Sequence, residues 1–271
     1  MIHIKKMMCV CAVLFAAISR IPPVFGAFEY IGLGWPAATA NIRVLGQHPH
    51  QSAVNPALMV INPSTQIILS YQNPFQSLGL RAGSVTIQNS VKQRPYIHHL
   101  EYFGDDHYSE LKLVNGSAWI IEKGYRVGVT LNYHHLSMSG ITPQYAISLS
   151  LTSYAEISDQ LKVGSVMEHV IQWGDVLSLP QKFHMGGEYV VGPAKIAIAL
   201  EKESALPLET CLGLQLASRS FWQIGVGYRD LSGMMSAGWR IRTRNFAFHY
   251  VCVMHPHLPV SHGFGLELEI P

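Results

Sequence analysis

The sequence contains few charged residues. Lys, Arg, Asp and Glu make up 13% of its 271 residues, compared with roughly 25% in ordinary soluble domains, whereas 48% of the residues are hydrophobic. The 19 basic and 17 acidic residues nearly balance. Nucleic-acid binding, which requires clustered Lys and Arg, is therefore not expected. Such a chain has an unusual amount of apolar surface to remove from water.

Long apolar runs are also missing after the start of the chain. Two lysines and a twelve-residue apolar stretch, residues 7–18, come first, and small residues follow at Gly26 and Ala27. This order predicts that residues 1–26 are a secretory signal peptide, cleaved near Gly26 or Ala27. An uncleaved anchor is the alternative, but the stretch is shorter than the roughly 20 residues that a spanning helix needs. No later run is long enough for a transmembrane helix.

Cysteine is scarce as well. Cys9 and Cys11 lie in the predicted signal peptide, which leaves Cys211 and Cys252 in the mature chain. These two residues fall on opposite faces in the strand pattern described next, so a disulfide between them is not expected, although an exported compartment would permit one.

What the sequence does have is alternation with period two. From Tyr125 to Tyr133 every second residue is apolar, and the residues between them are polar or small, such as Arg126, Gly128 and Asn132. This pattern is typical of a strand with one apolar face. It recurs in about fourteen segments, which begin near Gln66, Leu78, Tyr96, Gly116, Tyr125, Tyr145, Leu161, Lys182, Ala194, Leu208, Phe221, Gly233, Phe246 and Gly263.

The number of segments favours a membrane barrel over a soluble sandwich, which would also bury one face of each strand. About 205 residues lie between Gln66 and Ile270, so fourteen strands of roughly 10 residues leave only short connections, as in transmembrane hairpins. Aromatic residues also recur near strand ends, as an interfacial girdle would place them. We predict an all-β protein, in which residues 65–271 form a transmembrane antiparallel up-and-down β-barrel of about 14 strands in an outer membrane.

Charged residues are expected on the face opposite the lipid, because a charge on the lipid face costs a few kcal/mol near mid-membrane. Many of their neighbours on that face are Gly, Ala or Ser, which leave room for a lumen or for an inserted segment. The candidate lumen-facing residues are Arg81, Arg126, Lys195, Glu201, Glu209, Arg240, Glu267 and Glu269.

Residues 27–64 precede the first predicted strand and are rich in Gly, Ala, Pro and Asn. Within them Asn55-Pro56-Ala57 predicts a turn, because Asn and Pro both favour turn conformations. We interpret this stretch as a short plug or hatch inside the barrel. The alternative is a periplasmic tail without function, since chain ends are often mobile.

Three parts of the chain together resemble the PorV/PorQ group within the FadL-like outer-membrane barrels. They are the segment around Asn55-Pro56-Ala57, the first two predicted strands, and the stretch from Ala237-Gly238-Trp239-Arg240 to the final Gly263-Phe264-Gly265-Leu266-Glu267-Leu268. The resemblance implies fourteen strands and an N-terminal segment that enters the lumen. The chain departs from the group in its short connections, and from many outer-membrane proteins in ending Glu269-Ile270-Pro271 without a terminal aromatic residue.

The resemblance implies two functions. PorV-like members are non-enzymatic partners of secreted proteins in the type IX secretion pathway, so the expected role is a barrel subunit in protein secretion or surface assembly. FadL itself carries long-chain fatty acids, so transport of hydrophobic small molecules across the outer membrane is the alternative. A secreted soluble β-sandwich or adhesin is a second alternative. The expected partners are outer-membrane lipid with either secretion-system proteins or hydrophobic small molecules.

Neither a metal, another cofactor nor a catalytic site is expected. Fourteen histidines include His48-Pro49-His50 and adjacent pairs such as His98-His99, but adjacent residues in a strand point to opposite faces and cannot chelate together. The closest nucleophile and base, Ser261-His262, diverge for the same reason.

Overall fold

The computed structural model describes residues 32–46, 48–76, 79–174, 177–204, 206–218 and 221–271. The predicted signal peptide, residues 1–26, lies outside these ranges. No helix in the described ranges has the length and hydropathy needed to cross a membrane.

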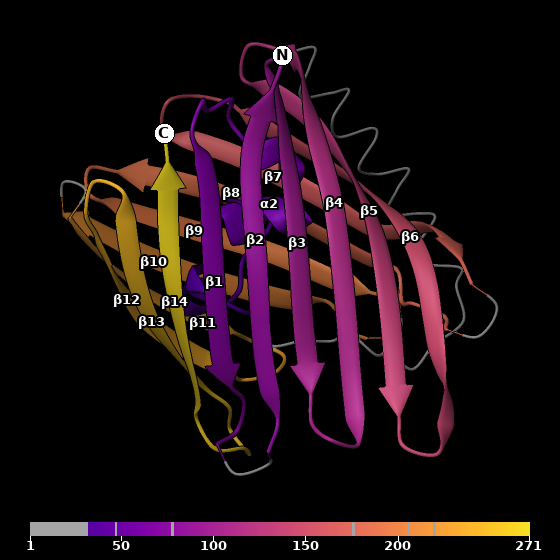
Figure 1. The fold of residues 1–271 in the computed structure, drawn as a ribbon. Coiled ribbons are helices and arrows are strands. Elements are labelled where there is room, and N and C mark those ends of the chain that lie inside the picture. The colour runs from indigo at the N-terminus through magenta and orange to yellow at the C-terminus, as the bar shows by residue number, and fades with distance from the viewer. Residues whose placement is uncertain (1–31, 47, 77–78, 175–176, 205, 219–220) are drawn as a thin grey trace.

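Fourteen strands in the described ranges form a closed antiparallel barrel (Figure 1). Each strand pairs with the next along the chain, and the last pairs with the first, so the predicted strand number and order are confirmed. The strands are β1 (Thr65–Asn73), β2 (Arg81–Val91), β3 (Arg94–Gly104), β4 (Tyr108–Glu122), β5 (Tyr125–Met138), β6 (Ile141–Glu156), β7 (Leu161–Trp173), β8 (Lys182–Val191), β9 (Ala194–Glu203), β10 (Glu209–Ser218), β11 (Trp222–Arg229), β12 (Met235–Arg242), β13 (Phe246–Met254) and β14 (Ser261–Ile270).

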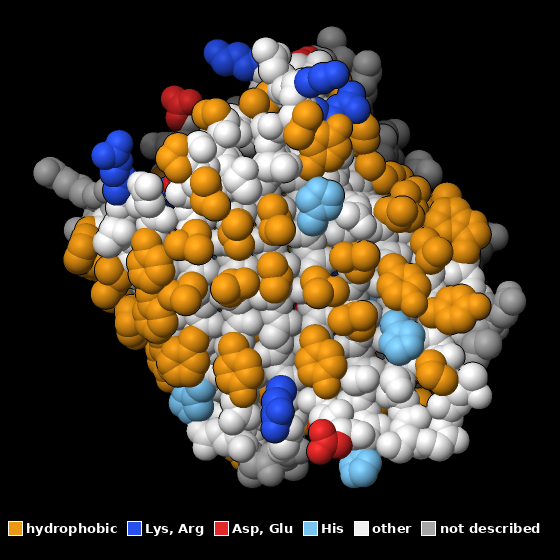
Figure 2. Space-filling model, viewed as in Figure 1, with side chains coloured by type: hydrophobic (Ala, Val, Ile, Leu, Met, Phe, Trp, Pro, Cys, Tyr) orange, Lys and Arg blue, Asp and Glu red, His pale blue; other side chains and the backbone are white. Residues whose placement is uncertain are grey.

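Alternation places apolar side chains on the outer face and polar or small ones inside. In β5, Leu131 is 49% exposed, whereas its neighbour Asn132 is 3% exposed and Thr130 is 2% exposed. Figure 2 shows hydrophobic side chains covering the middle of the barrel face, with the Lys, Arg, Asp and Glu side chains in view lying toward its two ends. The outside is therefore apolar where a bilayer core would contact it.

The fourth strand corrects a predicted boundary. Its start was expected near Gly116, but β4 begins at Tyr108. Glu110 and Lys112 lie in the added part, and both point inward with Val114, while Leu113 is exposed outside. Two charges in a short run hide the alternation in sequence.

The two ends of the barrel differ in their connections. At one end, which we call the short-turn end, pairs of strands are joined by residues 92–93, 123–124 and 192–193. At the other, the long-connection end, the longest connections are residues 74–80, 174–181 and 255–260. The C-terminus lies at the short-turn end (Figure 1).

Residues 32–46 and 48–64, which we call the internal segment, fill part of the barrel. The segment contains η1 (Trp35–Thr39), α2 (Pro49–Val54) and η2 (Pro56–Leu58). Helix η1 contacts β10 to β13, α2 contacts β1 to β4, and η2 contacts β4 to β6. All residues of η1 and η2, and Pro49 to Ala53 of α2, are buried. The segment therefore touches most of the inner wall.

Local sequence explains how the internal segment folds. Pro49 occupies the first turn of α2, where its missing N–H costs nothing. The His48 side chain accepts a hydrogen bond from the His50 backbone N–H, and the Gln51 side chain accepts one from the His48 backbone N–H, which caps the helix. After the helix Asn55, fully buried, donates to the carbonyl of Val44 at 2.9 Å. Many hydrogen bonds of this short stretch are thus formed between its own polar groups.

Glycines on the inner wall allow the internal segment to approach closely. A Cβ on Gly164 would collide with the Val44 carbonyl oxygen, and a Cβ on Gly227 would collide with the Ala40 nitrogen. Both contacts are to backbone, which cannot move aside as a flexible side chain can. The close contact between the internal segment and the inner wall therefore requires glycine at these positions.

Candidate functional site

The internal segment separates two cavities that share no lining residue. The short-turn cavity, about 280 Å³, lies between the segment and strands β1, β2 and β9 to β14. The long-connection cavity, about 190 Å³, lies at the other end, between the segment and strands β8 to β11. Charged and amide side chains line both cavities. We treat the two cavities and the segment between them as the candidate functional site.

Ion pairs neutralise most charges of the long-connection cavity. Arg229 at the end of β11 contacts Glu201 at 2.6 Å and also binds Glu209. Lys182 contacts Glu203 at 2.9 Å. Because a buried charge is tolerated only when it is paired, these contacts account for the presence of the residues inside the barrel.

The same network reaches the internal segment through Glu168. This carboxylate lies 2.9 Å from His184 Nε2 and 3.8 Å from Arg43, which belongs to the segment. Lys112 of β4 approaches its second oxygen at 3.8 Å. Glu168 therefore links the internal segment to β8, through His184, and to β4, through Lys112.

A bulge in β7 places Glu168 and His169 inside together. His169 has a left-handed backbone with φ 58°, and the pairing with β6 shifts register between Leu149 and Leu151. Its ring lies 2.8 Å from the Ser148 hydroxyl and packs edge-on against His134. A bulge re-aims side chains in this way because one residue is left without a partner.

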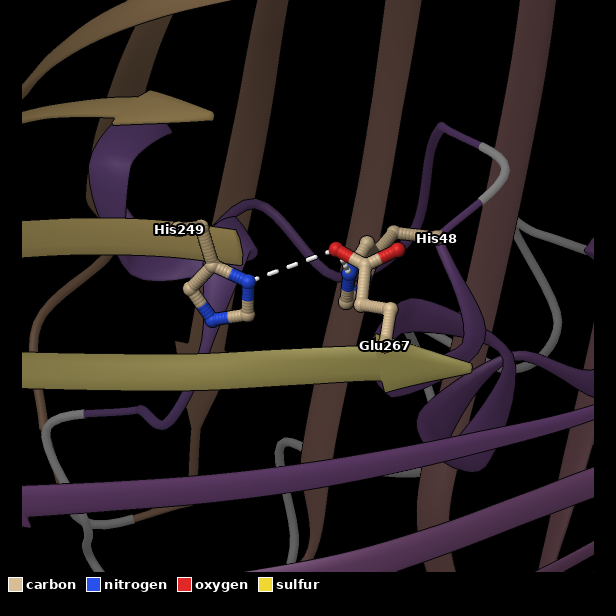
Figure 3. A group of neighbouring side chains, drawn as sticks. All are labelled: His48, His249 and Glu267. Atoms are coloured by element: carbon tan, nitrogen blue, oxygen red, sulfur yellow. Dashed lines mark hydrogen bonds and ion pairs between the residues drawn. The ribbon is translucent and has the colours of Figure 1, made fainter. Parts of the chain in front are cut away.

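A second cluster joins the internal segment to the last strand at the short-turn cavity. Figure 3 shows His48, on the loop before α2, facing His249 of β13 and Glu267 of β14. Glu267 Oε1 lies 3.1 Å from His48 Nε2 and 3.3 Å from His249 Nδ1. Arg240 donates to the same carboxylate from its Nε at 2.7 Å and from a terminal nitrogen.

This cluster has donor atoms close enough for a metal ion, with one atom from each of His48, His249 and Glu267 within 4.8 Å of the others. Two contacts oppose a metal. His48 Nδ1 accepts from the His50 backbone, so its Nε2 carries the proton and donates to Glu267. Arg240 already holds the carboxylate. The arrangement fits a hydrogen-bonded cluster better than a ligand set.

Burial keeps both histidines of the internal segment neutral. It lowers the pKa of His48 from 6.5 to about 4, although Glu267 acts in the opposite direction. Burial also lowers the pKa of His50, whose Nε2 lies 3.0 Å from the Ser84 hydroxyl. A neutral His48 agrees with its Nδ1 acting as an acceptor.

Seven of the eight residues predicted to face the lumen have side chains inside. Lys195, Arg240, Glu267 and Glu269 line the short-turn cavity, and Glu201 and Glu209 line the long-connection cavity. Arg126 is 7% exposed and donates to the Met59 carbonyl at 3.0 Å.

Arg81 is placed differently. It is exposed and shares the outer face of β2 with Val85, while Ala82 and Ser84 point inward. Because successive residues of a strand alternate, an error of one residue in the register moves a side chain to the other face. Arg81 lies at the first position of its strand, at the long-connection end.

The predicted turn Asn55-Pro56-Ala57 forms the junction between α2 and η2, and all three residues are buried. Sequence reasoning missed Arg229, although it continues the alternation of Gln223, Gly225 and Gly227 and could have been found that way. It also missed Glu168, because the β7 bulge interrupts the alternation there. His184 shares the buried face of β8 with Gly186 and Glu188, so it could have been found from that alternation. No local signal marks His48 as a partner of the last strand.

Comparison with known proteins finds similarity of structure only. No family model matches the chain, and no curated protein matches its sequence. The structure of the toluene transporter TbuX from Ralstonia pickettii has a TM-score of 0.70 at 9% identity, covering 90% of this chain and 100% of that one. The toluene transporter TodX from Pseudomonas putida has a TM-score of 0.66 at 7% identity, covering 92% and 100%.

A FadL homologue from Pseudomonas aeruginosa is also similar, with a TM-score of 0.58 at 9% identity and coverage of 92% of this chain and 99% of that one. These neighbours are FadL-type outer-membrane barrels. At such identities the similarity shows a shared fold. The FadL-like part of the resemblance is thus supported in architecture, whereas nothing compared supports the PorV/PorQ group.

Proposed function

We propose that this protein spans an outer membrane with its fourteen strands and transports hydrophobic small molecules past the internal segment. The main support for the proposal is the position of this segment, which lies between two cavities inside a closed barrel with an apolar outer face. A segment in this position blocks the lumen but is not part of the barrel wall. No catalytic role is proposed.

The outer face supports a membrane location. Large apolar side chains are exposed on all fourteen strands, as with Leu131 of β5, Leu212 of β10 and Leu266 of β14. Each would be unfavourable in water by roughly 25 cal/mol per Å² of exposed apolar area. In outer-membrane barrels the short turns face the periplasm, so we place the short-turn end there and the long-connection end outside the cell.

The cargo class is supported by the structural neighbours. The names of TbuX and TodX describe toluene transporters, and that of a third neighbour, CymD, describes a monoaromatic hydrocarbon channel. The secretion role implied by PorV/PorQ has no comparable support. Transport is therefore the preferred function.

Two experiments test the proposal. First, the outer-membrane fraction is analysed on SDS gels with and without boiling, and a band that shifts on heating is expected of a stable membrane barrel. Second, uptake of radiolabelled toluene and oleate is measured in cells that produce the protein and in cells carrying an empty vector. Saturable, protein-dependent uptake of either probe is expected. A heat-shifting barrel without uptake, but with a co-purifying secreted protein, would favour the secretion role instead.

A further inference from the structure

The short-turn cavity has one cation without a partner in the described ranges, whereas every cation that lines the long-connection cavity is ion-paired or hydrogen-bonded. In the long-connection cavity Arg229, Lys182 and Arg43 are all paired with carboxylates. In the short-turn cavity Arg240 and Arg242 are likewise paired, with Glu267 and Glu269. What remains in the short-turn cavity is a cation and a buried amide oxygen.

The cation is Lys195 of β9. Its ammonium lines the short-turn cavity and has no hydrogen bond or ion pair with any residue in the described ranges. The lining therefore carries three positive side chains, Lys195, Arg240 and Arg242, and two negative ones, Glu267 and Glu269. At neutral pH the difference is one positive charge, which favours an anion over a cation or a neutral molecule.

The amide oxygen belongs to Gln88 of β2. Gln88 is 8% exposed, lines the same cavity, and its Oε1 has no hydrogen-bond partner. An unpaired buried acceptor is unfavourable by about 1–3 kcal/mol, so the position calls for a donor such as a hydroxyl group. Further carboxamides, Gln66, Gln215 and Gln223, line the cavity and offer both donors and acceptors.

Lys195 and Gln88 lie on strands far apart around the barrel, since β9 and β2 are separated by β10 to β14 and β1. A ligand that meets both must be elongated. An apolar molecule would leave the Gln88 oxygen unpaired and would remove water from Lys195 without compensation. The volume of about 280 Å³ is close to the lower limit of small-molecule sites.

We propose that the short-turn cavity binds an elongated, hydroxyl-rich monocarboxylate, a sugar acid in chemical class, with its carboxylate at Lys195 and a hydroxyl donating to Gln88. This site is additional to the hydrophobic cargo and rests only on the barrel and its internal segment. Given the orientation proposed above, the ligand enters from the periplasmic side.

Calorimetric titration of the full-length protein in detergent tests the site with four probes. Lactobionate supplies a carboxylate and many hydroxyls, lactose supplies the hydroxyls without the charge, octanoate supplies the carboxylate without the hydroxyls, and inorganic phosphate supplies charge alone. Lactobionate is expected to bind at least tenfold more tightly than each of the other three. Equal binding of lactobionate and lactose would overturn the role of Lys195, and equal binding of phosphate would reduce the cavity to a general anion site and overturn the proposal.

Three variants test which residues bind lactobionate. Lys195→Gln is expected to weaken lactobionate binding about tenfold and to abolish its preference over lactose. Gln88→Leu is expected to weaken both sugars severalfold. Lys92→Gln, which alters an exposed lysine in a turn at the same end, serves as the control and should change nothing. Unchanged lactobionate binding in Lys195→Gln would overturn the proposal.

The heat shift on SDS gels shows whether each variant is folded, and Lys195→Gln alone suffices if Gln88→Leu fails to fold. Failure of lactobionate to bind a heat-shifting barrel overturns this inference and leaves toluene and oleate uptake to decide the transport function. Absence of toluene and oleate uptake together with intact lactobionate binding would overturn the transport function and leave the sugar-acid site standing.

Discussion

His48 Nε2 lies 3.1 Å from Glu267 Oε1, across 219 residues of sequence, and this contact joins the internal segment to the strand that closes the barrel. Its geometry requires a proton on His48 Nε2, which the helix cap at Nδ1 fixes. The seat of the internal segment thus depends on the last strand. The contact itself requires that β14 is in place.

Glu267→Gln is expected to loosen the internal segment. The substitution leaves Arg240, whose side chain is 11% exposed, without its counter-charge. Removing one partner of a buried pair costs about 3 kcal/mol or more. We expect a lower temperature for the SDS-gel heat shift and a higher conductance in planar bilayers. Arg242→Gln is the control, because the Arg242 side chain is 45% exposed and its pair with Glu269 contributes about 1 kcal/mol at most. Equal effects of both substitutions would contradict the prediction.

Acidification is expected to release the internal segment. The docked state lowers the pKa of His48 from 6.5 to about 4, so a released His48 binds a proton more readily than a docked one. Docking is therefore fully stable above about pH 6.5 and loses roughly 1.4 kcal/mol per pH unit as pH falls toward 4.

The groups that face His48 are Glu267, Arg240, His249 and His50. Conductance measured from pH 7 to pH 4 should rise in the wild type. His48→Gln should flatten this rise, because the side chain no longer titrates. A rise of the same size in the variant would assign the effect to other groups.

Gly164→Ala is expected to displace the internal segment. The new methyl group would meet the Val44 carbonyl oxygen and approach the Asn55 side chain at 3.3 Å. Overpacking of this kind costs about 1–3 kcal/mol. Gly187→Ala, on the neighbouring strand, is the matched control, because the nearest atom to its added carbon is the Lys162 carbonyl oxygen at 3.9 Å. Liposome swelling should increase for the first variant only.

The apolar outer face predicts where a charge can be tolerated. Leu131 lies in the middle of β5 and is 49% exposed, so Leu131→Arg should cost about 2–4 kcal/mol in a bilayer and reduce assembly. Val91, 52% exposed, is the last residue of β2, and Val91→Arg should cost no more than about 1 kcal/mol. The yield of heat-shifting protein in the outer membrane measures both. Equal yields would argue against a bilayer around mid-barrel.

Much of the barrel could be predicted from sequence, because alternation is a local property. The expected starts at Tyr125, Leu161, Lys182, Ala194 and Phe246 coincide with the observed strands. The predicted faces of β5 are confirmed by buried Arg126 and Asn132 and exposed Leu131. Cys211 and Cys252 are both free, with Cys211 buried inside and Cys252 partly exposed.

The interior was harder to predict, because its contacts join residues far apart in sequence. The pairing of His48 with Glu267, or of Arg43 with Glu168, has no local signature. The predicted inward position of Arg81 differs from the structure for another reason. The face on which a strand's first residue lies depends on where the strand begins. The β7 bulge has no glycine at its left-handed position, which is occupied by His169, so no glycine marks it in the sequence.

The link between η2 and β1 limits how far the internal segment can travel. The link is residues 59–64, six residues, which span at most about 21 Å when extended. They leave β1 at the short-turn end, so a released segment swings toward that mouth and remains attached there. We therefore expect that a segment released from the inner wall stays attached at this mouth and can bind the wall again, because the link to β1 holds it there.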